Sequence, residues 1–163
     1  MLFRSKYPHL KVLLNGGLDT NEQIATHWND FDGFMVGRAA YHLPAMLLGW
    51  DELIQSDGQA FGYLFSEAEW HRIQKGLVKQ SQAWLAECEA KNKPFYLGVI
   101  TRHILGLAHG RAGSRRWRQR LSDHHALALV KTNDAIESFF LEASAELGDW
   151  AIFDSSLNAS TVI

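Results

Sequence analysis

Residues 10–38 read LKVLLNGGLDTNEQIATHWNDFDGFMVGR, and this stretch decides the fold. Residues 11–14, KVLL, are apolar almost throughout, which is typical of a parallel strand that is buried on both faces. Thr20 and Gln23 have the spacing of a capping box, which predicts a helix that begins shortly after the two glycines. Residues 31–36 form a second apolar run. The stretch therefore predicts two parallel strands that are joined by a helical crossover.

Two short loops follow the predicted strands and are the candidate binding residues. Asn15, Gly16 and Gly17 follow the first strand, and Gly37 and Arg38 follow the second. Adjacent glycines allow backbone N–H groups to converge on an anion, and a guanidinium can hold a phosphate through two hydrogen bonds. A glycine pair after a strand is also common in a plain turn. The two loops together favour a phosphate site, because neighbouring parallel strands place their carboxyl ends at one edge of a sheet or barrel.

Motifs in both parts of the chain carry a resemblance to one family. VLLNGG at residues 12–17 and FDGFMVGRAAYH at residues 31–42 resemble the end of the flavin barrel of tRNA-dihydrouridine synthases. The later motifs are similar to the helical domain of the A-type branch of that family: ITRHILGL at 100–107, GRAG at 110–113 and WR at 117–118. The resemblance extends over roughly residues 8–150 and is specific because it combines barrel motifs with helical-domain motifs.

The resemblance implies an α/β part followed by an all-α part. Residues 1–55 are expected to form the last β/α units of a (β/α)8 TIM barrel, and residues 56–65 are the expected boundary. Residues 66–152 are expected to form a tRNA-binding helical bundle, and residues 153–163 a frayed tail. A whole barrel needs about 250 residues, so the 163 residues are expected to be the carboxyl-terminal half of the family protein. The missing amino-terminal barrel half is then an expected partner.

The resemblance also implies a reaction and its cofactors. A tRNA-dihydrouridine(20/20a) synthase reduces a D-loop uridine of tRNA with FMN, which NADPH re-reduces. The residues expected on the flavin phosphate side are Asn15, Gly16, Gly17, Gly37 and Arg38. No catalytic residue is expected in this chain, because the family's catalytic cysteine lies on an earlier barrel loop and Cys88 does not match it. The chain alone is therefore expected to be inactive.

Positive charge is concentrated in one stretch of the predicted helical part. Residues 98–131 hold seven Lys or Arg and one acid, Asp123, although the net charge of the whole chain is only −2. One interpretation is a solvated helix that neighbouring acidic helices neutralise. The other is a surface that grips RNA phosphates, which the resemblance favours. The expected RNA-binding residues are Arg102, Arg111, Arg115 and Arg118. Trp117 could stack on a base, but core packing is the commoner use of such a residue.

Capping and periodicity predict helices from Pro44 onward. Pro44 favours the first turn of a helix that extends toward Ile54, the expected last barrel helix. Ser66 and Glu69 again have capping-box spacing, which predicts a long helix to about residue 91. Helical spacing places Cys88 on the core face of that helix.

Three further helices are predicted. The first follows Pro94 and has an apolar stripe that ends at Leu107. The second is capped by Ser114, and the third spans residues 126–147.

Composition excludes several classes of protein. The single cysteine excludes an internal disulfide and a cysteine-rich metal site, and the eight histidines show no metal-type pairing. No apolar run approaches the roughly 20 residues of a transmembrane helix, and no signal peptide follows Met1, which favours the cytoplasm. Two function classes remain: part of a flavoenzyme, or a non-catalytic RNA-binding module that carries a barrel remnant.

Overall fold

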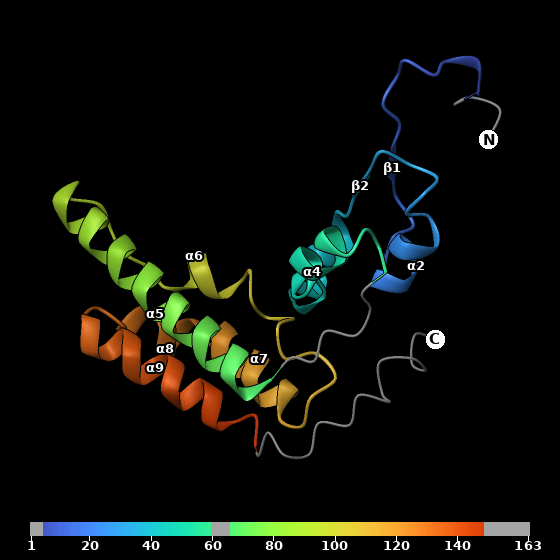
Figure 1. Cartoon of the computed structure of the whole chain (residues 1–163). Coiled ribbons are helices and arrows are strands. Elements are labelled where there is room, and N and C mark those ends of the chain that lie inside the picture. Colours follow the sequence, from blue (N-terminus) through green and yellow to red (C-terminus); the bar gives the residue numbers. More distant parts are fainter. Residues whose placement is uncertain (1–4, 60–65, 149–163) are drawn as a thin grey trace. The chain divides into compact units, whose positions relative to one another are not determined.

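The computed structural model describes residues 5–59 and 66–148 (Figure 1). Internal contacts divide the chain into two units, residues 1–63 and 64–163, and each unit is described by itself. The expected tail at 153–163, residues 149–152 and most of the expected boundary lie outside the described residues.

The first unit contains a two-stranded parallel sheet. Strand β1 spans Leu13–Asn15 and strand β2 spans Gly33–Met35, with Leu14 opposite Phe34 and Asn15 opposite Met35. The parallel pairing predicted from the two apolar runs is confirmed. Both strands are shorter than their apolar runs, and Asn15 belongs to β1 rather than to the loop after it.

Helix α2, Asn21–Thr26, connects the two strands and begins as predicted. The Thr20 side chain accepts a hydrogen bond from the Gln23 backbone N–H, and the Gln23 side chain accepts one from the Thr20 N–H. These reciprocal bonds satisfy backbone donors that the first turn leaves unpaired. Ile24 is buried on this helix and anchors the small core of the unit.

Only one face of the sheet is covered within the described residues. Leu14 and Phe34 pack against the buried cluster of Leu18, Ile24 and Leu53. On the other face Leu13 is 64% exposed and Met35 is 49% exposed. The prediction of a strand buried on both faces is therefore wrong for the described chain, because helices of this unit cover one side of the sheet only.

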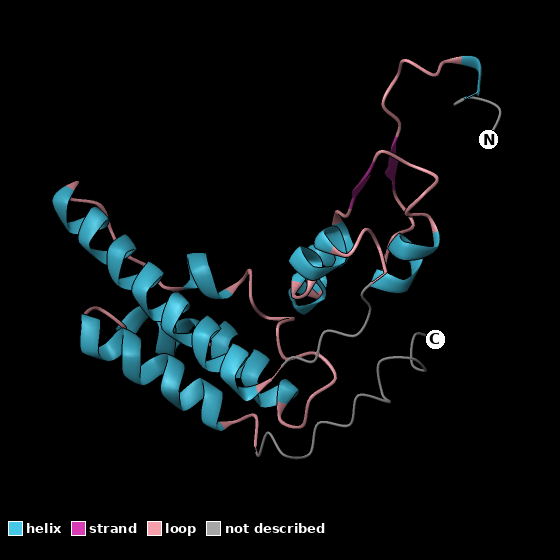
Figure 2. Ribbon diagram, viewed as in Figure 1, coloured by secondary structure: helices cyan, strands magenta, loops and turns pink. Residues whose placement is uncertain are grey.

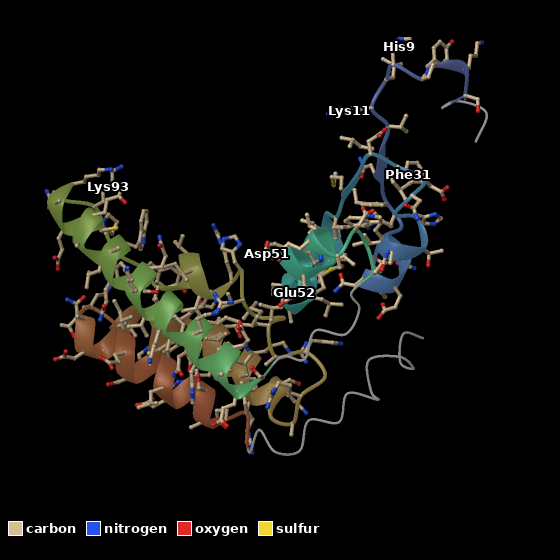
Figure 3. All side chains as sticks on the ribbon, viewed as in Figure 1. His9, Lys11, Phe31, Asp51, Glu52 and Lys93 are labelled. Atoms are coloured by element: carbon tan, nitrogen blue, oxygen red, sulfur yellow. The ribbon has the colours of Figure 1, made fainter. Side chains whose placement is uncertain are left out.

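The segment after β2 forms three short helices instead of one. These are α3, Arg38–His42; the 3-10 helix η1, Pro44–Leu47; and α4, Trp50–Gln55. The single helix expected from Pro44 to Ile54 is wrong because Gly49 has a φ of 84°, a left-handed conformation that interrupts helical hydrogen bonding. Asp51 and Glu52 lie in the first turn of α4 (Figure 3), where the helix dipole stabilises negative charge.

The second unit is helical throughout its regular structure in residues 66–148 (Figure 2). Its helices are α5, Glu67–Ala90; α6, Gly98–Thr101; α7, Ser114–Ser122; α8, His124–Leu129; and α9, Asn133–Ala145. As predicted, the Ser66 side chain caps α5 by accepting a hydrogen bond from the Glu69 N–H.

The core of the second unit is built mainly between α5, α7 and α9. Helices α5 and α9 lie side by side (Figure 1). The Trp70 and Trp117 rings meet edge to face with centroids 5.0 Å apart, and the indole N–H of Trp117 donates to the Ile104 carbonyl. Trp117 is thus a core residue, and buried Cys88 faces the core as predicted. Phe140 is also fully buried, on α9.

Three helix predictions for this unit need correction. The helix after Pro94 is only the four-residue α6. The chain from there to Leu107 forms turns instead, held by backbone hydrogen bonds between residues three apart, such as Leu107 N–H to Ile104 O. Ser114 is the first helical residue rather than the cap, a position that Gly113 takes. The predicted helix 126–147 is interrupted before α9, where the Thr132 side chain accepts from the Ala135 N–H and starts a new helix.

We expect the two units to differ in hydrogen-exchange protection. A two-stranded sheet with one bare face is marginal by itself, whereas the helical unit closes a larger core. Amides in α5 and α9 should exchange much more slowly than those in β1, β2 and α2. Peptide-level exchange measured by mass spectrometry checks this, and equal protection in both units would contradict it.

Candidate functional site

A pocket in the first unit brings together every residue that the sequence predicted for an anion site. Its lining includes all five predicted residues, Asn15, Gly16, Gly17, Gly37 and Arg38. The lining also includes four residues that were not predicted: Leu18, Asp19, Met35 and Ala39.

The sheet register explains why residues 20 positions apart share this pocket. Asn15 at the end of β1 pairs with Met35 at the end of β2 in a parallel register. The chain leaves both strands at the same edge, so the loop after Asn15 and the loop after Met35 face each other across one opening. Met35 could have been found from this register, and Leu18, Asp19 and Ala39 from their neighbours in sequence.

The glycine pair gives the pocket an open backbone wall. Gly16 and Gly17 have φ of 93° and 69°, the left-handed region where a side chain is strained. A Cβ atom added to either glycine would meet no atom within 4 Å, so both face open space. Backbone amides in such a loop can approach a ligand closely.

The pocket contains one cation and one anion. Arg38 is exposed at the start of α3 and offers a guanidinium fork that suits a phosphate. Asp19 is also exposed, and its backbone N–H donates to the Gln23 side chain as part of the α2 start. The arrangement fits an anion that is attached to a group able to donate hydrogen bonds to a carboxylate.

The second candidate site is the arginine-rich helix α7. Arg115 and Arg118 are exposed and lie three residues apart, so they share one side of the helix. Neither makes an ion pair with a carboxylate within residues 5–59 and 66–148. Their guanidinium groups are therefore available to a phosphate as far as the described structure extends.

Two further arginines of α7 are paired with carboxylates on α9 or directly after its end. The Arg116 Nε atom lies 2.9 Å from a carboxylate oxygen of Glu146, and Arg120 donates to Glu142. The Arg120 guanidinium also lies over the Phe139 ring, 5.3 Å from its centroid. The side of α7 that carries Arg116 and Arg120 matches the alternative raised from the sequence, in which acidic helices neutralise the basic stretch.

The other two predicted RNA-binding arginines, Arg111 and Arg102, lie outside α7 and have different surroundings from Arg115 and Arg118. Arg111 is 7% exposed, and burial lowers the pKa of its guanidinium. It lies in the turn between Gly110 and Gly113, outside α7, so it shares no exposed side with Arg115. Arg102 is exposed at the end of α6 and donates to the His103 ring.

The described residues were also compared with the requirements of a membrane-spanning helix and of a metal site. No helix in the described part of the chain is both long and apolar enough to cross a membrane. Among the described residues, no three His, Cys, Asp or Glu side chains gather in a way that could hold a metal ion. Asp123 caps α8, and the hydrogen bond from the Ala126 N–H is the main cause that lowers the pKa of its carboxyl.

Comparisons with a family model and with individual proteins point to the same family. The sequence model of the family described as Dihydrouridine synthase (Dus) matches residues 3–143. Three similar proteins are each named tRNA-dihydrouridine(20/20a) synthase. The Pseudomonas aeruginosa protein is 39% identical over 77% of this chain, the Pseudomonas putida protein 38% over 80%, and the Escherichia coli K12 protein 35% over 76%.

The same comparisons show how much of a relative the chain represents. The matches cover 34%, 36% and 36% of the lengths of these three proteins, so the chain spans about a third of each. The family match extends across both units of the fold and includes the pocket and helix α7. The chain belongs to the dihydrouridine synthase family.

Proposed function

We propose that this chain is the carboxyl-terminal part of a tRNA-dihydrouridine(20/20a) synthase. Its first unit would be the last β/α segment of a TIM barrel that holds the phosphate of FMN. Its second unit would bind tRNA. The observation that carries the proposal is the pocket in which Gly16, Gly17 and Arg38 meet at one edge of a parallel sheet.

The pocket residues fit the phosphate end of FMN. Arg38 can bind phosphate oxygens through two N–H groups, and the loop at Gly16 and Gly17 can add backbone donors. Asp19 can accept a hydrogen bond from a hydroxyl of the chain that joins the phosphate to the flavin ring. FMN, when bound and kept reduced by NADPH, would supply the electrons that saturate a uridine.

The bare face of the sheet supports a larger enzyme. Leu13 and Met35 expose apolar surface on the face that no described helix covers. Parallel sheets are normally covered on both faces, and the relatives are about three times as long as the matched segment. The preceding barrel strands, in the same protein or in a partner chain, would pair with this sheet and bring the catalytic cysteine.

A chimera tests this proposal. This chain would replace the matching segment of the Pseudomonas aeruginosa relative, and the purified protein would be examined for a bound flavin by its absorption spectrum. We expect the chimera to carry FMN. A folded chimera, judged by circular dichroism, that binds no added FMN would contradict the proposal.

Binding of tRNA is expected to depend on Arg115 and Arg118. Each phosphate contact releases counterions, so Arg115→Ala or Arg118→Ala should flatten the plot of log affinity against log salt by about 0.7 to 0.9. The measurement is the affinity for an unmodified tRNA transcript at several salt concentrations.

Lys79→Ala is the control for tRNA binding, because Lys79 is an exposed cation on α5 and its loss should leave the slope unchanged. Reduced affinity with an unaltered slope in the arginine variants would point to misfolding. No change in either quantity would exclude these contacts.

A further inference from the structure

Helix α7 presents three different sides to its surroundings. Trp117 and Leu121 are buried and form the core side. The remaining arginines divide into two groups by spacing: Arg115 and Arg118 are three residues apart, whereas Arg116 and Arg120 are four apart and lie on the side of α9.

Two carboxylates, one on α9 and one directly after its end, hold the second group of arginines. Glu146 pairs with Arg116 and Glu142 pairs with Arg120. Arg116 and Glu146 are 68% and 41% exposed, and Glu142 is 59% exposed, whereas Arg120 is half-buried at 36%. Because exposed ion pairs of this kind are weak, a phosphate could replace either carboxylate as the partner of the guanidinium.

We propose that Glu142 and Glu146 compete with RNA phosphates for Arg116 and Arg120. The two acids thereby confine the RNA-binding surface of α7 to Arg115 and Arg118. This inference rests on the proposed binding of RNA and adds an intramolecular competitor that sets its strength. A paired arginine releases no counterions from RNA, so the competition lowers both the affinity and its salt dependence.

The two pairs are not equivalent. Within the described part of the chain Arg116 makes one ion pair and is largely exposed, whereas Arg120 also packs over the Phe139 ring. Loss of Glu142 would leave Arg120 on the α9 side, where the aromatic contact still favours it. Loss of Glu146 would release Arg116 to solvent. Removal of Glu146 should therefore make an arginine more available to RNA than removal of Glu142 does.

The experiment compares three single substitutions in the full chain. Glu146→Gln and Glu142→Gln remove the competing charges, and Glu137→Gln removes an equal charge from α9. Glu137 is exposed and makes no ion pair with any residue that the structure describes. Affinity for an unmodified tRNA transcript would be measured across a salt series, with thermal melting as the test of folding.

We expect Glu146→Gln to steepen the salt dependence by about 0.7 to 0.9 and to raise affinity about 5- to 8-fold near 0.1 M salt. Glu142→Gln should have a smaller effect in the same direction. Glu137→Gln should change affinity less than about 2-fold, because it only alters the general field. Adding Arg116→Ala to Glu146→Gln should abolish the gain.

Two results would overturn the inference in distinguishable ways. If the unsubstituted chain binds tRNA and all three glutamine variants behave alike, Glu142 and Glu146 are not competitors and RNA binding itself stands. If neither the unsubstituted chain nor any variant binds tRNA, the proposed RNA binding fails and the competition fails with it.

Discussion

Replacement of Arg38 by alanine is expected to weaken FMN binding by roughly 10- to 150-fold in the chimera with the Pseudomonas aeruginosa relative. Arg38 is the only cation among the residues that line the described pocket. A hydrogen bond to a charged group contributes about 1.5 to 3 kcal/mol, which corresponds to this range. The dissociation constant can be measured by flavin fluorescence.

Two control variants sharpen this prediction. Arg38→Lys keeps the charge but loses the planar fork, so it should weaken binding less than alanine does. Lys11→Ala removes a cation of the same unit that does not line the pocket, and Lys11 is labelled in Figure 3. Its effect should be small. Equal affinities for Arg38→Ala and the unsubstituted chimera would exclude Arg38 from the phosphate site.

Replacement of Trp117 by alanine is expected to destabilise the helical unit by about 3 to 5 kcal/mol. Trp117 is 1% exposed, meets the Trp70 ring and donates its indole N–H to the Ile104 carbonyl. The substitution leaves a cavity between α5 and α7, and the loss is a large part of the stability of an ordinary domain. Urea unfolding followed by far-ultraviolet circular dichroism measures it.

Leu129→Ala is the matched control for Trp117. Leu129 is 69% exposed on α8, so its truncation should change stability by no more than about 0.5 kcal/mol. A cost below about 1 kcal/mol for Trp117→Ala would show that the tryptophan pair does not organise this core. Such a result would also reopen the alternative that Trp117 stacks on a base.

Local rules predicted the parts of the fold that depend on short stretches. The Thr20 and Ser66 caps follow from side chains that satisfy nearby backbone donors. The parallel pair follows from two apolar runs one crossover apart, and its edge gathers the predicted pocket residues. None of these inferences needs knowledge of distant contacts.

Other features depend on packing that a sequence pattern does not contain. Apolar residues at helical spacing from Leu97 to Leu107 are also compatible with consecutive turns, because both repeat every three to four residues. Charge spacing did not separate buried Arg111 from exposed Arg115, since burial depends on how the turn packs against its neighbours. Gly113 illustrates this packing: an added Cβ would lie 1.8 Å from the Glu146 carbonyl oxygen.

The most direct measurement of the central proposal is dihydrouridine in tRNA, quantified by mass spectrometry. Unmodified tRNA would be incubated with FMN and NADPH, together with either this chain or the chimera. If the chain supplies the phosphate pocket and the RNA-binding unit of an otherwise incomplete enzyme, the chimera will form dihydrouridine and the chain alone will not. Dihydrouridine above the flavin-only background with the chain alone, or none with a folded chimera that holds FMN, would contradict the proposal.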